Sequence, residues 1–185
     1  ARGCRQGVPI RGQANVQKSE KPILQPFRNK IPMLNFIRLF LTALGIGCMP
    51  FAPGTWGSIP GLLLCGVWAR YPWIVPFLFC LSYVAIKNYP LENDDPKWVV
   101  IDEVIGMGTA CLIYFQYYRC YHWLGLLLLF CFFRLFDIVK PFPIDWIERQ
   151  LRRINIPLSI LVDDVVAGIF ASLATIFVMP PMVCC

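Results

Sequence analysis

The sequence predicts an all-α protein, a compact bundle of membrane-embedded and re-entrant helices. Hydrophobic residues make up 57% of the 185 residues and charged residues 15%, against roughly 45–50% and about 25% in soluble domains. The mean hydropathy is +0.59. Only helices or closed barrels satisfy the backbone in lipid, and the ten-residue alternation of barrel strands is absent. Helices embedded in a bilayer are therefore expected.

The N-terminal region differs from the rest in composition. Residues 1–32 are polar and contain seven Lys or Arg and one Glu, so they carry the whole net charge of +6. Subtracting them from the 17 basic and 11 acidic residues leaves ten of each. We expect a disordered basic extension over 1–32 and a single membrane domain over 33–185. Met33 is as good a candidate for the natural start of the protein as a residue further upstream. A basic tail is not a folded basic face, so no nucleic-acid partner is expected.

Six apolar segments follow Met33, and their lengths are uneven. A span needs about 20 apolar residues, a length that the last segment reaches and the fourth nearly reaches. The shorter ones are predicted to be half-helices, re-entrant hairpins or tilted spans, with a break at Arg70–Pro72. In chain order the segments are 34–48, 59–69, 71–86, 98–116, 121–136 and 157–179.

Nine cysteines give no metal or redox pattern. There is no CxxC, and His122 is the one histidine, so a zinc site is not expected. Cysteine in an apolar run behaves as a small hydrophobe. We therefore expect buried, inert thiols at Cys65, Cys80, Cys111 and Cys131.

Five acids interrupt the apolar segments: Asp102, Glu103, Asp137, Asp163 and Asp164. An unpaired carboxylate near lipid costs several kcal/mol, and only Arg134 and Lys140 lie nearby in the sequence. The surplus of carboxylates favours a hard divalent cation, Mg²⁺ first. Arg134 and Lys140 are suited to a phosphate group.

Glycines and prolines surround these charges. Gly106 and Gly168 each lie four residues after an acid, on the same helix face, which leaves room for a ligand or permits tight helix packing. Pro141 and Pro143 are expected to end a helix and leave Lys140 at its terminus. The segment 49–61 is predicted to be a loop, either one whose backbone N–H groups face phosphate oxygens or a plain turn.

Several motifs that the sequence lacks exclude known reaction mechanisms. It has no CxxxxxR of cysteine phosphatases, no DxD of aspartyl-phosphate phosphatases, no GxSxG, and no second histidine for the pair that other membrane lipid phosphatases use. The mechanism that is left is a metal ion that activates water for attack on phosphorus. A small transporter with intramembrane carboxylates is the alternative, and a non-catalytic membrane subunit is a third possibility.

Four motifs in this order resemble the phosphatidylglycerophosphatase A family: GIGCMPFAPGTWGSIPG, DDPKWVVIDEVIGM, FFRLFDIVKPFPIDW and VDDVVAGIFA. The resemblance implies a Mg²⁺-dependent enzyme of the bacterial inner membrane that converts phosphatidylglycerophosphate to phosphatidylglycerol and phosphate. The residues that match the family motifs are Pro53, Gly54, Thr55, Gly57, Ser58, Asp95, Asp102, Glu103, Gly106, Arg134, Asp137, Lys140, Pro141, Pro143, Asp163, Asp164 and Gly168. The chain departs from the family before its Asp-Asp pair, where RINIPLSI lacks the usual glycine.

Roles follow as expectations for these residues. Asp102, Asp163 and Asp164, with Glu103, are expected to hold Mg²⁺, and Glu103 or Asp137 to orient or deprotonate the attacking water. Arg134 and Lys140 are expected to clamp the phosphate, together with Gly54, Thr55, Gly57 and Ser58. Asp95, Gly106 and Gly168 support the site. Arg149, Arg152 and Arg153 place the connection 140–153 in the cytoplasm. Its i, i+4 pairs Asp145–Arg149 and Glu148–Arg152 predict a short helix on the membrane surface, so the site of this multi-pass protein should face the cytoplasm.

Overall fold

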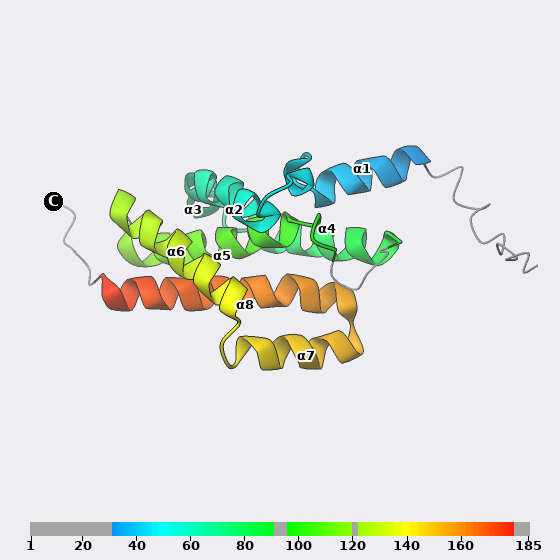
Figure 1. Cartoon of the computed structure of the whole chain (residues 1–185). Coiled ribbons are helices and arrows are strands. Elements are labelled where there is room, and N and C mark those ends of the chain that lie inside the picture. Colours follow the sequence, from blue (N-terminus) through cyan, green and yellow to red (C-terminus); the bar gives the residue numbers. More distant parts are fainter. Residues whose placement is uncertain (1–30, 91–95, 120–121, 180–185) are drawn as a thin grey trace, which may run out of the picture. The chain divides into compact units, whose positions relative to one another are not determined.

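A computed structural model describes residues 31–90, 96–119 and 122–179 (Figure 1). Every regular element in these residues is helical, which confirms the all-α prediction. From Pro32 onward the described residues pack as one unit. The elements are α1 (Ile31–Leu41), the 3-10 helix η2 (Ile46–Cys48), α2 (Pro53–Leu63), α3 (Cys65–Arg70), α4 (Ile74–Asn88), α5 (Ile101–Tyr118), α6 (Trp123–Val139), α7 (Ile144–Ile154) and α8 (Ile156–Val178).

The segment predicted as a loop over 49–61 is largely helical, so that prediction is wrong from Pro53 onward. Pro53 begins α2, where its fixed φ suits the first turn and its missing N–H costs nothing. Ala52 caps the helix in a left-handed conformation, with φ 45°. The predicted break near Arg70 is confirmed, since α3 ends there and α4 begins at Ile74.

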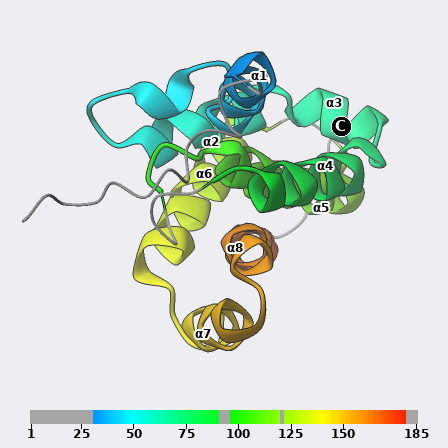
Figure 2. The same cartoon turned by 90° about the vertical axis from the view of Figure 1, so that its right-hand side faces the viewer.

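Helices α5 and α8 form the centre of the bundle. They lie side by side in both views, with α2 on the far side of α5 from α8 and α7 on the far side of α8 from α5 (Figures 1 and 2). Two glycines permit this close approach. A Cβ on Gly106 would lie 2.7 Å from the Asp164 carbonyl oxygen, and one on Gly168 would collide with the Gly106 carbonyl. The space beside each acid is thus filled by backbone, as the packing alternative expects.

Helix α7 runs antiparallel to the N-terminal half of α8 (Figures 1 and 2). The predicted i, i+4 pairs Asp145–Arg149 and Glu148–Arg152 are confirmed at 2.8 and 2.9 Å. The turn into α8 uses Asn155 in place of the missing glycine, because its side chain accepts a hydrogen bond from the Leu158 N–H at 3.1 Å. This is an ordinary N-cap.

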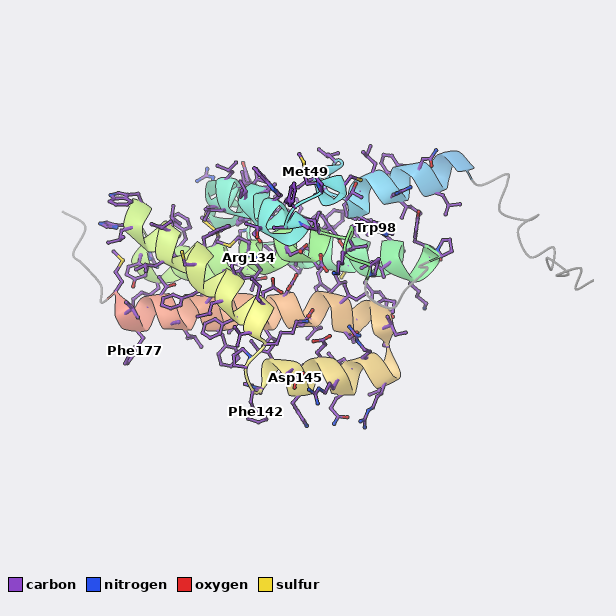
Figure 3. All side chains as sticks on the ribbon, in the orientation of Figure 1. Met49, Trp98, Arg134, Phe142, Asp145 and Phe177 are labelled. Carbon is purple, nitrogen blue, oxygen red and sulfur yellow. A yellow bond between two sulfur atoms is a disulfide. The ribbon has the colours of Figure 1, made fainter. Side chains whose placement is uncertain are left out.

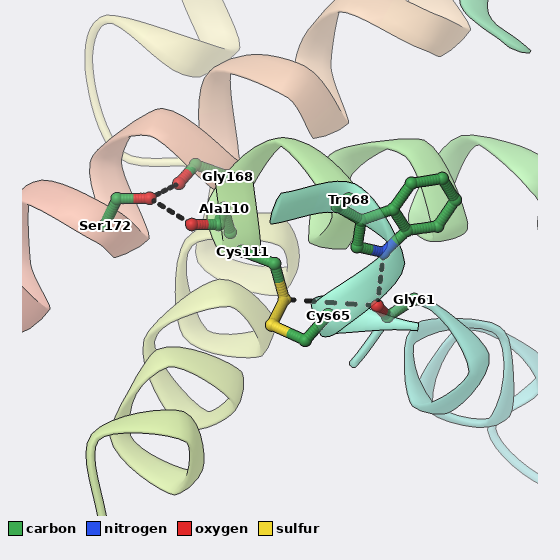
Figure 4. Close-up of a disulfide and its surroundings, with 7 residues drawn as sticks. All are labelled: Gly61, Cys65, Trp68, Ala110, Cys111, Gly168 and Ser172. Carbon is green, nitrogen blue, oxygen red and sulfur yellow. Dashed lines mark hydrogen bonds between the residues drawn. A yellow bond between two sulfur atoms is a disulfide. The ribbon is translucent and has the colours of Figure 1, made fainter. Parts of the chain in front are cut away.

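The cysteine prediction is partly wrong. Cys65 and Cys111 are buried as expected, but they form a disulfide between α3 and α5 (Figure 4). Cys80 and Cys131 are exposed thiols. The disulfide lies beside two hydrogen bonds, from the Trp68 indole to the Gly61 carbonyl and from Ser172 to the Ala110 carbonyl (Figure 4).

Large apolar side chains cover much of the outer surface. Phe142 and Phe177 point away from the bundle, at 83% and 89% exposure (Figure 3). Within the described ranges, α8 alone is long and apolar enough to cross a membrane, with 23 residues. The lipid-embedded arrangement of the other helices stays a prediction.

Candidate active site

A pocket of about 680 Å³ lies where four helix ends or turns meet. The first turns of α2 and α5, the end of α6 and the third turn of α8 form its walls, and α7 contributes one side chain. Its charged lining residues are Lys97, Asp102, Glu103, Arg134, Asp137, Lys140, Arg152, Asp163 and Asp164. All charged residues within α5, α6 and α8 therefore line this one cavity.

Three carboxylates form the innermost group of the pocket. Asp102, Glu103 and Asp164 each offer an oxygen, and these oxygens lie within 4.8 Å of one another. Glu103 Oε2 is buried and has no hydrogen-bond partner in the described part of the chain. Like charges this close repel strongly away from water, so a cation between the three carboxylates would stabilise the group. An all-oxygen ligand set fits Mg²⁺.

The packing of α5 on α8 produces this group. Gly106 sits against the Asp164 backbone, one helical turn after Asp102. The lack of a side chain at Gly106 thus brings the first turn of α5 level with the Asp164 turn of α8. Gly54 has a similar part on α2, since a Cβ there would collide with Glu103 Oε1 and lie 3.0 Å from an Arg134 nitrogen.

Arg134 lies on α6 where that helix crosses the bundle (Figure 3), and it is close to Glu103, since a Cβ on Gly54 would reach both side chains. Its guanidinium pairs with Asp137 at 2.7 Å and donates to the Ser58 hydroxyl at 3.1 Å. Ser58 in turn donates to the Gly54 carbonyl at 2.8 Å. Arg134 is therefore held in place by both its own helix and α2.

Lys140 caps the end of α6, where the predicted termination before Pro141 is confirmed. Its ammonium contacts Asp163 and pairs with Glu148 Oε2 at 2.7 Å. Burial alone would lower the pKa of Lys140, but the carboxylates of Asp163 and Glu148 together raise it above its ordinary value. Lys140 is thus a fixed positive charge.

The predicted residues separate into three sets in space. Asp163 faces Lys140, whereas Asp102, Glu103 and Asp164 form the carboxylate group. Gly57 and Ser58 are buried against Val100 and Arg134, behind the pocket wall. Asp95 lies outside the described residues. The residues that line the pocket as predicted are Gly54, Thr55, Asp102, Glu103, Arg134, Asp137, Lys140, Asp163 and Asp164.

Three charged residues at this site are not predicted from the sequence. Lys97 and Arg152 line the pocket, and Glu148 holds Lys140. As a surface i, i+4 pair, Glu148 and Arg152 give no sign in the sequence that their helix packs beside the acids of α8. Lys97 stands in DDPKW, a motif already recognised for its acids.

Comparison with known proteins shows which family the chain belongs to. The sequence profile described as phosphatidylglycerophosphatase A matches residues 39–179, about three quarters of the chain. The chain belongs to the phosphatidylglycerophosphatase A family. This confirms the resemblance of the four motifs and makes the protein an enzyme, a phosphatase, rather than a transporter or a non-catalytic subunit.

Three curated relatives extend over most of the chain. Phosphatidylglycerophosphatase A of Haemophilus influenzae is 33% identical over 150 residues, 77% of this chain and 88% of the relative. Phosphatidylglycerophosphatase A of Escherichia coli is 27% identical, covering 78% and 84%. A protein of Bacteroides thetaiotaomicron named putative phosphatidylinositol-3-phosphatase is 29% identical, covering 70% and 85%. No solved structure matches the chain.

Proposed function

We propose that the protein hydrolyses phosphatidylglycerophosphate to phosphatidylglycerol and inorganic phosphate, with Mg²⁺ as cofactor. The observation that carries this proposal is the carboxylate group Asp102–Glu103–Asp164 in one pocket with two fixed cations, Arg134 and Lys140. Acids alone would repel a phosphate monoester. Acids with a divalent cation and flanking bases attract it.

Each group has a defined part in this proposal. Asp102, Glu103 and Asp164 hold the cation, which supplies Lewis-acid stabilisation of charge at phosphorus when bound. Arg134 and Lys140 bind the phosphate oxygens. Asp137, or Glu103 through its second oxygen, orients and deprotonates water. The water oxygen forms a bond to phosphorus as its proton passes to the carboxylate, and the bond from phosphorus to the glycerol oxygen breaks. That oxygen then takes up the proton from the carboxylate.

The experiment is a phosphate-release assay on purified full-length protein in detergent with phosphatidylglycerophosphate. Release should require Mg²⁺, stop in excess EDTA and return when Mg²⁺ is restored. Full activity in EDTA would contradict the metal. No release under any condition would contradict the substrate.

We also propose a multi-pass protein of the bacterial inner membrane with its site at the cytoplasmic surface. Helix α7 exposes Arg149, Gln150 and Arg153, so the start of α8 beside it belongs at the membrane–water interface, and the rest of α8 crosses the hydrocarbon. Tyr117 and Trp123, 49% and 76% exposed at the α5–α6 turn, are suited to the opposite interface. The site then lies at headgroup level, where a lipid phosphate meets it without leaving the bilayer.

Cysteine labelling tests this orientation. In a background without native cysteines, Gln150→Cys on α7 should resist an impermeant thiol reagent added to intact cells and react after the cells are opened. Trp123→Cys, at the other end, is the matched control and should react from outside. The reverse pattern would show the orientation to be wrong.

A further inference from the structure

A second hollow lies at the opposite end of α5 from the active site, on the half of the bundle away from α7 (Figure 1). It has a volume of about 430 Å³ and lies between α3 and the last turn of α5, which pack together. Arg70, the last residue of α3, and Arg119, the C-cap of α5, both line it. Gln116 adds a side-chain amide one turn before Arg119. We refer to this space as the α3–α5 hollow.

The acids of the bundle lie far from the α3–α5 hollow. Seven acids fall in the described residues; five of them line the active-site pocket, and Asp145 and Glu148 lie on α7. Gln116 is about 20 Å along α5 from Asp102 at the helical rise per residue. The two arginines of the hollow therefore belong to an end of the molecule where the described chain supplies no negative side chain.

Arg70 and Arg119 are exposed residues whose charges are not balanced by a neighbour. Within residues 31–90, 96–119 and 122–179, neither side chain has an ion-pair partner or a hydrogen bond. Like charges that share a small space repel each other, and more strongly at the edge of an apolar medium than in bulk water. An anion between the two guanidinium groups would remove this repulsion and link α3 to α5.

The surroundings of the hollow favour a lipid headgroup over a dissolved anion. Tyr71 follows Arg70 directly, Tyr117 follows Gln116, and both rings are exposed. Exposed aromatic rings at a helix end are typical of the membrane–water interface. In the proposed membrane arrangement, the hollow lies at the headgroup level of the leaflet opposite the active site. The anionic group that a lipid presents at that depth is a phosphodiester.

We propose that Arg70, Gln116 and Arg119 bind the phosphodiester headgroup of an anionic phospholipid, at a site separate from the active site. The site rests on the proposed membrane arrangement and is independent of the proposed reaction. Planar guanidinium groups bind phosphate oxygens through paired hydrogen bonds, and the Gln116 amide donates a further one. Ala69 also lines the hollow, and its short side chain leaves the space open to the headgroup.

Lipid binding to the purified full chain in detergent tests the site without turnover. Phosphatidylserine is the probe, because it carries a phosphodiester and a net negative charge but is neither the proposed substrate nor the proposed product. EDTA keeps the active site free of Mg²⁺. Native mass spectrometry over a series of phosphatidylserine concentrations should show the first bound lipid weakened about tenfold in Arg70→Gln and in Arg119→Gln, the size expected for loss of one charged hydrogen-bonding contact. Phosphatidylcholine, which has no net charge, should bind the wild type and both variants alike.

Two further variants serve as controls. Arg149→Gln removes the same charge from an exposed arginine that pairs with Asp145 and does not line the hollow, so it should bind phosphatidylserine as the wild type does. Arg70→Lys keeps the charge and loses the planar group, and its affinity should lie between those of the wild type and Arg70→Gln. The Tm of each variant in phosphatidylcholine micelles should match that of the wild type, because the substituted side chains are exposed.

Three results would overturn the proposal. Arg70→Gln and Arg119→Gln could bind phosphatidylserine as the wild type does, or Arg149→Gln could weaken binding as much as they do, which would mean that the lipid responds to net charge alone. Displacement of the bound lipid by millimolar inorganic phosphate would indicate a site for a dissolved anion instead. Phosphate release by the wild type, measured separately, reports on the proposed function, so either proposal can fail without the other.

Discussion

Two pairs of neighbouring acids line one pocket, Asp102–Glu103 on α5 and Asp163–Asp164 on α8. The two pairs differ in how many of their members join the carboxylate group. Both members of the α5 pair join the carboxylate group. Of the α8 pair, only Asp164 does so, while Asp163 contacts Lys140. Successive residues on a helix point about 100° apart, so two neighbours rarely serve one centre. The α5 pair manages it because it lies in the first turn and Glu103 has the longer side chain.

Similar sequence patterns can therefore place acids in different chemical environments. Asp164 has like charges as neighbours, so the proposed function gives it a bound cation as its partner. Asp163 has a lysine as neighbour, so its charge is already balanced. Substitutions of the two residues should therefore differ in size and in their dependence on Mg²⁺.

The largest effect is expected for Asp164→Asn. The change removes one negative charge from the metal-binding group and should lower turnover at least about 100-fold. It should also raise the Mg²⁺ concentration needed for half-maximal activity. Phosphate release measured over a Mg²⁺ titration checks both. Wild-type rates in this variant would remove Asp164 from the proposed metal site.

Asp163→Asn should have a smaller effect, about tenfold, because it loosens Lys140 without emptying the carboxylate group. We expect KM to rise and the Mg²⁺ requirement to stay within about threefold of the wild type. The same Mg²⁺ titration decides the case. A Mg²⁺ requirement shifted as strongly as in Asp164→Asn would restore Asp163 as a metal ligand, the role first expected from the sequence.

The helices could be predicted because apolar runs and prolines act locally. The break at Arg70–Pro72 and the end of α6 before Pro141 were both predictable in this way. The loop predicted over 49–61 is wrong from Pro53 onward, because glycine and proline are typical of loops and proline is also common at the first position of a helix. The division between Asp163 and Asp164 depends on how α8 is rotated against α5. That rotation is set by the Gly106 and Gly168 contacts. The spacing of these glycines predicts close packing on their faces, but it does not predict that the two faces meet each other.

The extra charges were beyond sequence reasoning for the same reason. Glu148 and Arg152 form a pair that any exposed helix could carry, and only the packing of α7 beside α8 brings Arg152 to the pocket and Glu148 to Lys140. The Cys65–Cys111 disulfide joins residues 46 positions apart. No periodic pattern indicates that α3 and α5 meet at that level.

The contact between Gly106 on α5 and the Asp164 backbone on α8 aligns the two acid pairs. Gly106→Ala adds a methyl group 2.7 Å from the Asp164 carbonyl, so α5 and α8 must separate. Overpacking of this kind costs about 1–3 kcal/mol, and we expect a lower Tm with a severalfold loss of turnover. Gly66→Ala is a control on a half-exposed helix position, where neither value should change much. An unchanged Tm in Gly106→Ala would show that the interface can adjust.

The smallest effect on turnover is expected at the cysteines. Cys65 and Cys111 do not line the pocket, and their bond ties α3 to α5 away from both acid pairs. Cys65→Ser should keep turnover within about twofold, although loss of a disulfide typically lowers stability by about 2–5 kcal/mol. Cys131→Ser, at an exposed thiol, should change neither turnover nor Tm and serves as the control. A large loss of turnover in Cys65→Ser at a temperature where the variant remains folded would show that the α3–α5 contact also sets the geometry of Asp102 and Glu103. The two acid pairs would then depend on the packing of α3 against the middle of α5 as well as on α8.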